Sequence, residues 1–165
     1  MRGEHVHQLA DVMLKKGLRF GFTASSDSHG LLYHHGEARK RDPYRTGLTA
    51  VQAPELTRDA VFEALRTRRC YGTSGAKILL DMRVDGEPMG STLQRTGAVR
   101  VSARAHGESD VARLELITRD GVVATAAGSG RDAAIEADVS ADYVYARVVQ
   151  HDGEMAWASP VFIDA

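Results

Sequence analysis

The sequence has little cysteine, no excess of either charge and no long hydrophobic run. Its single cysteine, Cys70, cannot form a disulfide within the chain, which is consistent with a reducing compartment and a cytoplasmic location. The 21 basic and 22 acidic residues nearly cancel and are spread along the chain, so we expect no nucleic-acid partner. No apolar run approaches the roughly 20 residues that span a bilayer, so we also expect no membrane partner.

The chain does contain enough apolar residues to build a core. Of its 165 residues, 43% are hydrophobic and 26% are charged, which is ordinary for a folded globular protein. The spacing of the apolar residues changes near residue 76. We therefore predict an α+β protein with a first domain over residues 1–76 and a second over residues 77–165.

The first domain alternates helix and strand signals. Apolar residues at helical spacing predict a helix over residues 6–13, with Gly17 as its stop. Short apolar runs predict strands over residues 18–24 and 48–51. Thr57 is a good N-cap for a second helix, because Asp59 then falls in the first turn and arginines fall in the last. A brief strand follows from Cys70.

Beyond residue 77 the apolar period changes to two. Turn dipeptides of the hairpin type separate the apolar runs, at 85–86, 120–121 and 152–153. About seven short strands with regular turns predict an antiparallel β-sandwich of immunoglobulin-like architecture. The predicted strands cover residues 78–84, 98–106, 111–118, 121–126, 133–139, 143–150 and 155–163.

A candidate metal site follows the predicted strand over residues 18–24. Small residues there lead into Asp27-Ser28-His29, and a carboxylate and an imidazole two positions apart can point at one ion. The alternative is a turn in which Asp27 caps backbone amides and His29 is exposed. The same loop holds three further residues that suit zinc or manganese but are more often simply exposed: His34, His35 and Glu37.

Several segments together resemble the bacterial hydrolase branch of the PHP (polymerase and histidinol phosphatase) superfamily that includes carbaryl-hydrolase-like proteins. Residues 17–29 (GLRFGFTASSDSH) resemble the last metal-binding motif of that superfamily. The resemblance extends to GLTAV at 47–51, LTRDAVFEALR at 56–66 and RRCYGTSGAKI at 68–78. Residues 148–160 (VVQHDGEMAWASP) look like the end of the β-rich tail of such proteins.

The resemblance implies a distorted α/β barrel that holds two or three metal ions and cleaves phosphoesters, other esters or amides through a metal-bound hydroxide. Asp27 and His29 match the final Asp-x-His ligands of the family. The first ligands of the family, a His-x-His and residues on the middle strands, would precede residue 1. The chain therefore resembles the C-terminal portion of such an enzyme, a partial barrel remnant followed by the β-sandwich, with an incomplete metal site.

Other polar and aromatic residues have competing interpretations. In an intact barrel, the loop bearing Tyr71, Thr73 and Ser74 would lie near the metal and bind substrate, whereas a strand end with a hydroxyl-capped turn needs no ligand. Trp157 falls at a strand position where packing in the sandwich is the usual explanation. A carbohydrate-binding surface centred on Trp157 is a third, weaker hypothesis for the second domain.

Two functions remain open at this point. Under the first hypothesis, the chain is a fragment of a hydrolase that binds zinc, manganese or iron. The missing ligands then come from an absent N-terminal barrel portion or from a second subunit. Alternatively, it is a non-catalytic binding or oligomerisation module built on the β-sandwich. A homo-oligomer is expected under either hypothesis, because an exposed strand edge readily self-associates.

Overall fold

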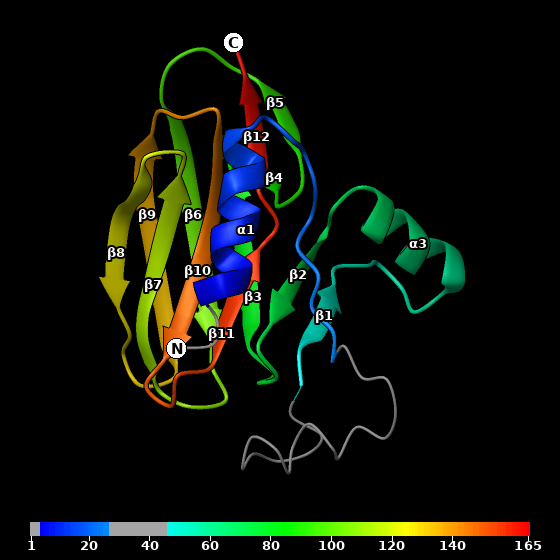
Figure 1. The fold of residues 1–165 in the computed structure, drawn as a ribbon, viewed down its shortest axis with the longest axis vertical. Helices are drawn as coiled ribbons and strands as arrows, with labels where there is room; N and C mark the ends of the chain where they lie inside the picture. Colours follow the sequence, from blue (N-terminus) through cyan, green and yellow to red (C-terminus); the bar gives the residue numbers. More distant parts are fainter. Residues whose placement is uncertain (1–3, 27–45) are drawn as a thin grey trace.

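The structure is a computed structural model that describes residues 4–26 and 46–165, with side chains in the first range described from Ala10 onward. Two β-sheets pack face to face, and helix α1 (Glu4–Lys15) lies against the outer face of one of them (Figure 1). Helix α3 (Arg58–Arg66) projects sideways from the sheets. The predicted β-sandwich is therefore confirmed as an architecture.

The larger sheet has eight strands and crosses residue 76. Its order runs β1, β2, β11, β10, β12, β5, and β7 and β8 extend it from the other edge of β10. All its pairs are antiparallel except β5 with β12. The bounds are β1 (Leu48–Val51), β2 (Cys70–Thr73), β5 (Thr92–Gln94), β7 (Val111–Thr118), β8 (Gly121–Ala127), β10 (Tyr143–Gln150), β11 (Met155–Ala158) and β12 (Val161–Asp164).

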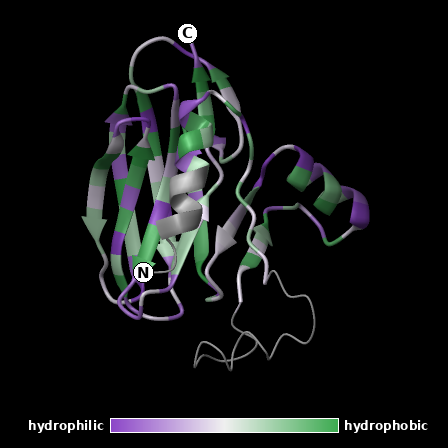
Figure 2. Cartoon of the chain, in the orientation of Figure 1, coloured by the Kyte–Doolittle hydropathy of each residue, from purple (hydrophilic) through white to green (hydrophobic). Residues whose placement is uncertain are grey.

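The smaller sheet has four strands in the order β4 (Glu87–Pro88), β3 (Leu79–Val84), β6 (Val99–His106), β9 (Asp132–Val139). Buried and exposed residues alternate along β3, β6 and β9, because only one face of this sheet meets the core. Bands of hydrophobic and hydrophilic residues accordingly alternate along the strands of the sandwich (Figure 2). The inward residues of both sheets, among them Met82, Val101, Leu116 and Val148, form the main core.

A second, smaller core lies on the outer face of the larger sheet. Leu14 of α1 and the phenylalanines at 20 and 22 pack there against aromatic and aliphatic side chains of the sheet: Ile117, Tyr143, Tyr145, Trp157 and Phe162. Strand β10 is consequently buried on both faces, and seven of its eight residues are buried. This explains why its sequence shows a continuous apolar run instead of strict alternation.

Most predicted elements are confirmed, and two differ. Helix α3 begins after Thr57, whose hydroxyl accepts a hydrogen bond from the backbone N–H of Ala60 (3.3 Å) as an N-cap does. The strand predicted over 155–163 is two strands, separated at Ser159-Pro160, because proline has no N–H to give to a ladder. The strand predicted over 18–24 is wrong, because these residues form no β-ladder.

The partial barrel implied by the family resemblance has no counterpart among the described residues before 77. The two strands in that part, β1 and β2, pair with each other in antiparallel fashion, and β2 pairs with β11 of the second half. Barrel strands of the PHP type would be expected to run parallel. The structure therefore supports a β-sandwich, and the relationship to a PHP-type barrel stays a proposal.

Candidate functional site

Residues 18–26, which we call the strap, leave α1 and run over the outer face of the larger sheet (Figure 1). The strap forms no β-ladder with the sheet, and hydrogen bonds from side chains hold it there instead. The hydroxyl of Ser159 accepts a hydrogen bond from the N–H of Phe22 (2.8 Å) and donates one to the carbonyl of Cys70 (2.5 Å). The hydroxyl of Thr49 accepts from the N–H of Ala24 (3.0 Å) and donates to its carbonyl (2.8 Å).

Glycines allow the strap to lie this close to the strands beneath it. A Cβ atom at Gly47 would be 2.7 Å from the carbonyl oxygen of Ser25, and one at Gly72 would be 3.1 Å from the Cβ of Ala24. Backbone atoms cannot yield as a flexible side chain can. Positions 47 and 72 therefore require glycine for the strap to keep its course.

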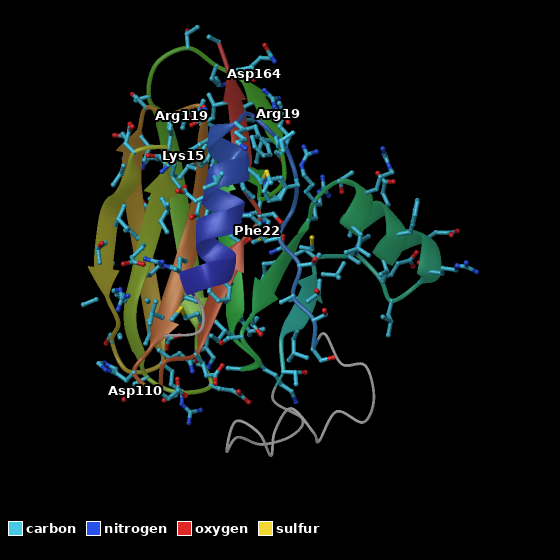
Figure 3. The ribbon with its side chains drawn as sticks, viewed as in Figure 1. Lys15, Arg19, Phe22, Asp110, Arg119 and Asp164 are labelled. Atoms are coloured by element: carbon cyan, nitrogen blue, oxygen red, sulfur yellow. The ribbon has the colours of Figure 1, made fainter. Side chains whose placement is uncertain are left out.

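The upper end of the strap and the end of α1 are tied by arginines (Figure 3). Arg19 forms an ion pair with Asp164, with one contact of 3.0 Å between Nη1 and Oδ2. Arg119 pairs with Asp142 and also donates to the carbonyl of Lys15 (2.7 Å), one of the carbonyls that a helix end leaves unpaired. Both ends of the described strap are therefore attached to the sandwich.

The predicted metal ligands lie outside the described residues. This applies to Asp27 and His29 and to the three further candidates, His34, His35 and Glu37. Within residues 4–26 and 46–165, no three histidine, cysteine or acidic side chains gather in a way that could hold a metal ion. Asp27 and His29 follow directly after the strap in the sequence, and metal binding by them stays a proposal.

The three predicted substrate-binding residues lie at the end of β2 and in the loop that follows it. The hydroxyl of Tyr71 donates to the carbonyl of Ile78 (2.9 Å) and accepts from the N–H of Leu80 (3.3 Å), within the core. Thr73 is buried and accepts a hydrogen bond from the N–H of Gly75 (3.2 Å), which is a hydroxyl-capped turn. These contacts correspond to the structural alternative that the sequence left open.

Ser74 is half-buried and reaches a carboxylate that the sequence did not single out. Its hydroxyl donates to Oε2 of Glu154 (2.5 Å) and accepts from the N–H of Met155 (2.8 Å). Glu154 is only 4% exposed, although its sequence context, directly after Asp152-Gly153, is that of a solvated hairpin turn. The start of the apolar alternation at Met155 was the one sign that this glutamate lies at the edge of a buried strand.

A second buried carboxylate, Glu115 of β7, lies on the same outer face as the strap. It accepts hydrogen bonds from Arg113 (2.8 Å) and from Arg147 of β10 (2.6 Å). Burial alone would raise the pKa of Glu115, but the hydrogen bonds and charges of the two arginines outweigh it and hold that pKa below its ordinary value. Glu115 is therefore ionised at neutral pH and joins β7 to β10.

Trp157, the residue considered for carbohydrate binding, is partly buried among other aromatic side chains of the larger sheet. Tyr143 and Tyr145 are buried, and Trp157 packs in the same layer beside the strap. Burial raises the pKa of Tyr143 to about 12 and raises that of Tyr145 as well. The hydroxyl of Tyr143 and the indole N–H of Trp157 are buried and find no hydrogen-bond partner in the described part of the chain. The described residues therefore form no exposed aromatic surface centred on Trp157.

Comparison with known proteins places the chain near uncharacterised relatives. Residues 33–109 match a family described as "Protein of unknown function (DUF3604)". An uncharacterized protein of Chlamydia trachomatis is 32% identical over 173 residues, and one of Chlamydia muridarum is equally similar. An uncharacterized protein of Chlamydia pneumoniae is 30% identical over 174 residues.

The match covers 92% of this chain but only 28% of each of these relatives, so the chain spans little more than a quarter of their length. No solved structure matches it. Among the described residues, neither helix has the length and hydrophobicity needed to cross a membrane.

Proposed function

We propose that this chain supplies one corner of a PHP-type metal centre that hydrolyses phosphoesters, other esters or amides. Asp27 and His29 are the proposed metal ligands. The observation that carries the proposal is the anchored course of the strap, whose last described residue, Ser26, directly precedes Asp27. Hydrogen bonds to Ser159 and Thr49 hold the backbone that leads into the two ligands.

The donor set suits the proposed ion. A carboxylate and an imidazole together are ligands that zinc, manganese and iron accept. When bound, such an ion supplies a water of lowered pKa, which is a nucleophile near neutral pH. The chain's own part is to hold the ligands at a constant spacing. Rigid support of this kind is what keeps a ligand pair in productive geometry.

The remaining ligands would come from outside the pair. His34, His35 and Glu37 are candidates within the same loop, and a second subunit or an N-terminal barrel portion is the other proposed source. The chain matches about 28% of the length of its relatives, which leaves ample polypeptide in proteins of that size to complete a site. We accordingly expect little hydrolysis by the chain alone.

Metal content tests this proposal directly. The purified protein is loaded with Zn²⁺, Mn²⁺ or Fe²⁺, passed through a desalting column and assayed by inductively coupled plasma mass spectrometry. We expect stoichiometric metal in the wild-type protein and its loss in Asp27→Ala and in His29→Ala. His151→Ala is the matched control, because His151 is exposed in the hairpin between β10 and β11.

Two results would contradict the metal centre. One is that wild type retains no metal and shows the same melting temperature with and without a chelator. The other is that Asp27→Ala and His29→Ala retain as much metal as His151→Ala. In either case, the strap would be a structural feature without a ligand.

A second candidate function, an oligomerisation module, is favoured by the surface of α3. Phe62 and Leu65 of α3 are 66% and 41% exposed, and Leu56, just before the helix, is 97% exposed; α3 stands apart from the sandwich. Ala64 is buried, and Phe62 lies on roughly the opposite side of the helix because residues two apart do not face the same way. Exposed apolar groups in such a cluster are typical of contact surfaces.

Light scattering coupled to size-exclusion chromatography tests the second function. If α3 mediates self-association, wild type is a dimer or larger and Phe62→Asp is a monomer. Leu79→Asp is the control, because Leu79 is equally exposed (65%) but lies on β3. A wild-type protein that stays monomeric at high concentration excludes this function without bearing on the metal centre.

A further inference from the structure

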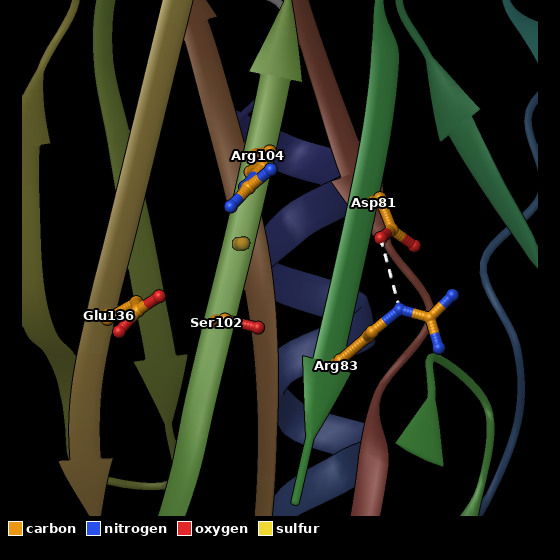
Figure 4. A pocket seen from close by; sticks show the side chains of 6 residues that line it. Asp81, Arg83, Ser102, Arg104 and Glu136 are labelled. Carbon is orange, nitrogen blue, oxygen red and sulfur yellow. Dashed lines mark hydrogen bonds and ion pairs between the residues drawn. The ribbon is translucent and has the colours of Figure 1, made fainter. Parts of the chain in front are cut away.

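The outer face of the smaller sheet has a shallow hollow that is separate from the strap and from α3. Its volume is about 210 Å³, and it is lined by side chains of β3, β6 and β9 (Figure 4). Its position follows from the strand register. Ser102 of β6 lies opposite Arg83 of β3 on one side and opposite Glu136 of β9 on the other. A short serine between two long side chains leaves space above it, so Ser102 forms the floor.

The next row along the same face closes one end of the hollow. Arg104 lies two residues after Ser102 on β6, so both side chains are on the same face. The register places Arg104 opposite Asp81 of β3. The carboxylate of Asp81 nevertheless accepts from Arg83 on its own strand (3.3 Å), and Figure 4 shows Arg104 apart from that pair.

The charges around the hollow are paired except for one. Asp81 is paired with Arg83, and Glu136 is paired with Arg100 (3.0 Å). Arg104 has no ion pair or hydrogen bond with any side chain in the described ranges, and neither has the hydroxyl of Ser102. The hollow therefore combines one uncompensated guanidinium and one available hydroxyl with two carboxylates at its rim.

We propose that this hollow binds a small polyhydroxylated carboxylate, of the size and chemistry of a single uronic acid ring. The ligand's carboxylate contacts the guanidinium of Arg104, which has a planar pair of donors matched to that group. Its hydroxyls hydrogen-bond to Ser102 and to the carboxylate oxygens of Glu136 and Asp81. Most drug-sized ligands occupy pockets of roughly 300–1,000 Å³, so the smaller hollow fits one ring and binds it weakly.

The acidic group and the hydroxyls of the ligand contact different residues of the hollow. A simple anion would satisfy Arg104 but would face the rim carboxylates without offering them a hydrogen bond. A neutral sugar would satisfy the carboxylates and Ser102 but would leave Arg104 uncompensated. A molecule with an acidic group and several hydroxyls satisfies both. Because the site is exposed, its affinity is expected to fall as salt is added.

Titration by ¹H–¹⁵N NMR tests the proposal on the whole chain without metal. The probes are D-glucuronate, D-glucose and acetate, each raised through the millimolar range. We expect D-glucuronate to shift the amide signals of residues 81–83, 102–104 and 134–136 with saturation. D-Glucose and acetate should shift them far less. Arg104→Gln should weaken D-glucuronate binding roughly five- to tenfold, the effect of losing one charge-assisted hydrogen-bonded contact.

Arg131→Gln is the matched control, because Arg131 is also exposed and its side chain has no ion pair among the described residues. It should bind D-glucuronate as wild type does. If acetate bound as tightly as D-glucuronate, the hollow would recognise only the anionic group, and the proposal would be overturned. Equal binding of D-glucose, an unchanged affinity in Arg104→Gln with native spectra, or the absence of saturable shifts would also overturn it. None of these outcomes bears on metal binding by Asp27 and His29.

Discussion

Ser159 accepts a hydrogen bond from the backbone N–H of Phe22, a residue 137 positions earlier in the chain. The same hydroxyl donates to the carbonyl of Cys70 in β2. One small side chain at the break between β11 and β12 therefore joins the strap, the sheet and the C-terminal segment. Because the proposed metal ligands follow the strap, this contact connects the stability of the sandwich with the proposed site.

Replacing Ser159 by alanine should destabilise the protein by about 1–3 kcal/mol, because the half-buried N–H of Phe22 loses its acceptor. The free energy of unfolding in urea measures the effect. Ser140→Ala is the control, because Ser140 is exposed in the turn before β10 and should be nearly neutral. If the two variants had equal stability, the strap would not depend on Ser159.

The hydroxyl of Thr49 should decide how firmly the strap is held. Thr49→Val keeps the shape of the side chain but removes both hydrogen bonds to Ala24, whereas Thr49→Ser keeps them. We expect faster hydrogen exchange of the Ala24 amide in Thr49→Val only. If the proposed metal centre is correct, Thr49→Val should also bind metal more weakly. Equal exchange in both variants would show that the hydroxyl does not hold the strap.

The hydroxyl of Tyr143 should lower the stability of the folded protein. It is buried without a hydrogen-bond partner among the residues described, so Tyr143→Phe removes an unsatisfied polar group. We expect Tyr143→Phe to stabilise the protein by up to about 1 kcal/mol in thermal or urea unfolding. The matched change Tyr145→Phe should not stabilise, because Tyr145 does have an interaction partner. A loss of stability in Tyr143→Phe would show that the hydroxyl is paired in solution.

Glu115 should make the stability of the protein depend on pH. Its pKa in the folded protein is lower than in the unfolded chain, so its contribution is complete above the unfolded pKa and is lost as the pH falls through the folded value. We therefore expect the free energy of unfolding of wild type to fall on acidification more steeply than that of Glu115→Gln.

Glu63→Gln is the control for the pH series. Glu63 pairs with Arg66 on α3, which lowers its pKa, but both side chains are more than half exposed and such pairs contribute little. The pH dependence of Glu63→Gln should therefore resemble that of wild type. If Glu115→Gln and wild type gave parallel curves, Glu115 would not be the group whose protonation weakens the contact between β7 and β10.

Local features of the sequence determined much of the fold. The Thr57 cap and the helical spacing after it predicted α3, and period-two alternation predicted three of the four strands of the smaller sheet, β3, β6 and β9, almost to the residue. Asp85-Gly86 predicted a tight hairpin turn, and both residues have positive φ angles of 49° and 85°. These signals are readable because each depends only on neighbours within a few positions along the chain.

The candidate site was predicted less completely. The Asp-x-His motif singled out Asp27 and His29 by residue type and spacing, which still leaves metal binding to experiment. The buried carboxylates of Glu115 and Glu154 gave little sign in the sequence, because a glutamate in a strand is usually solvated. Their burial depends on partners that are distant in the sequence, Arg147 of β10 for Glu115 and Ser74 of the loop after β2 for Glu154.

What the sequence by itself determined was both described helices, most of the strands, their turns and the position of the Asp-x-His motif. Only the tertiary structure decided that residues 18–26 form a strap held by Thr49 and Ser159 and that β2 joins β11. These outcomes depend on contacts between residues far apart in the chain. An apolar run such as residues 18–24 can bury its side chains equally well as a strand within a sheet or as a segment lying across one. Only the packing of the whole chain selects between these two arrangements.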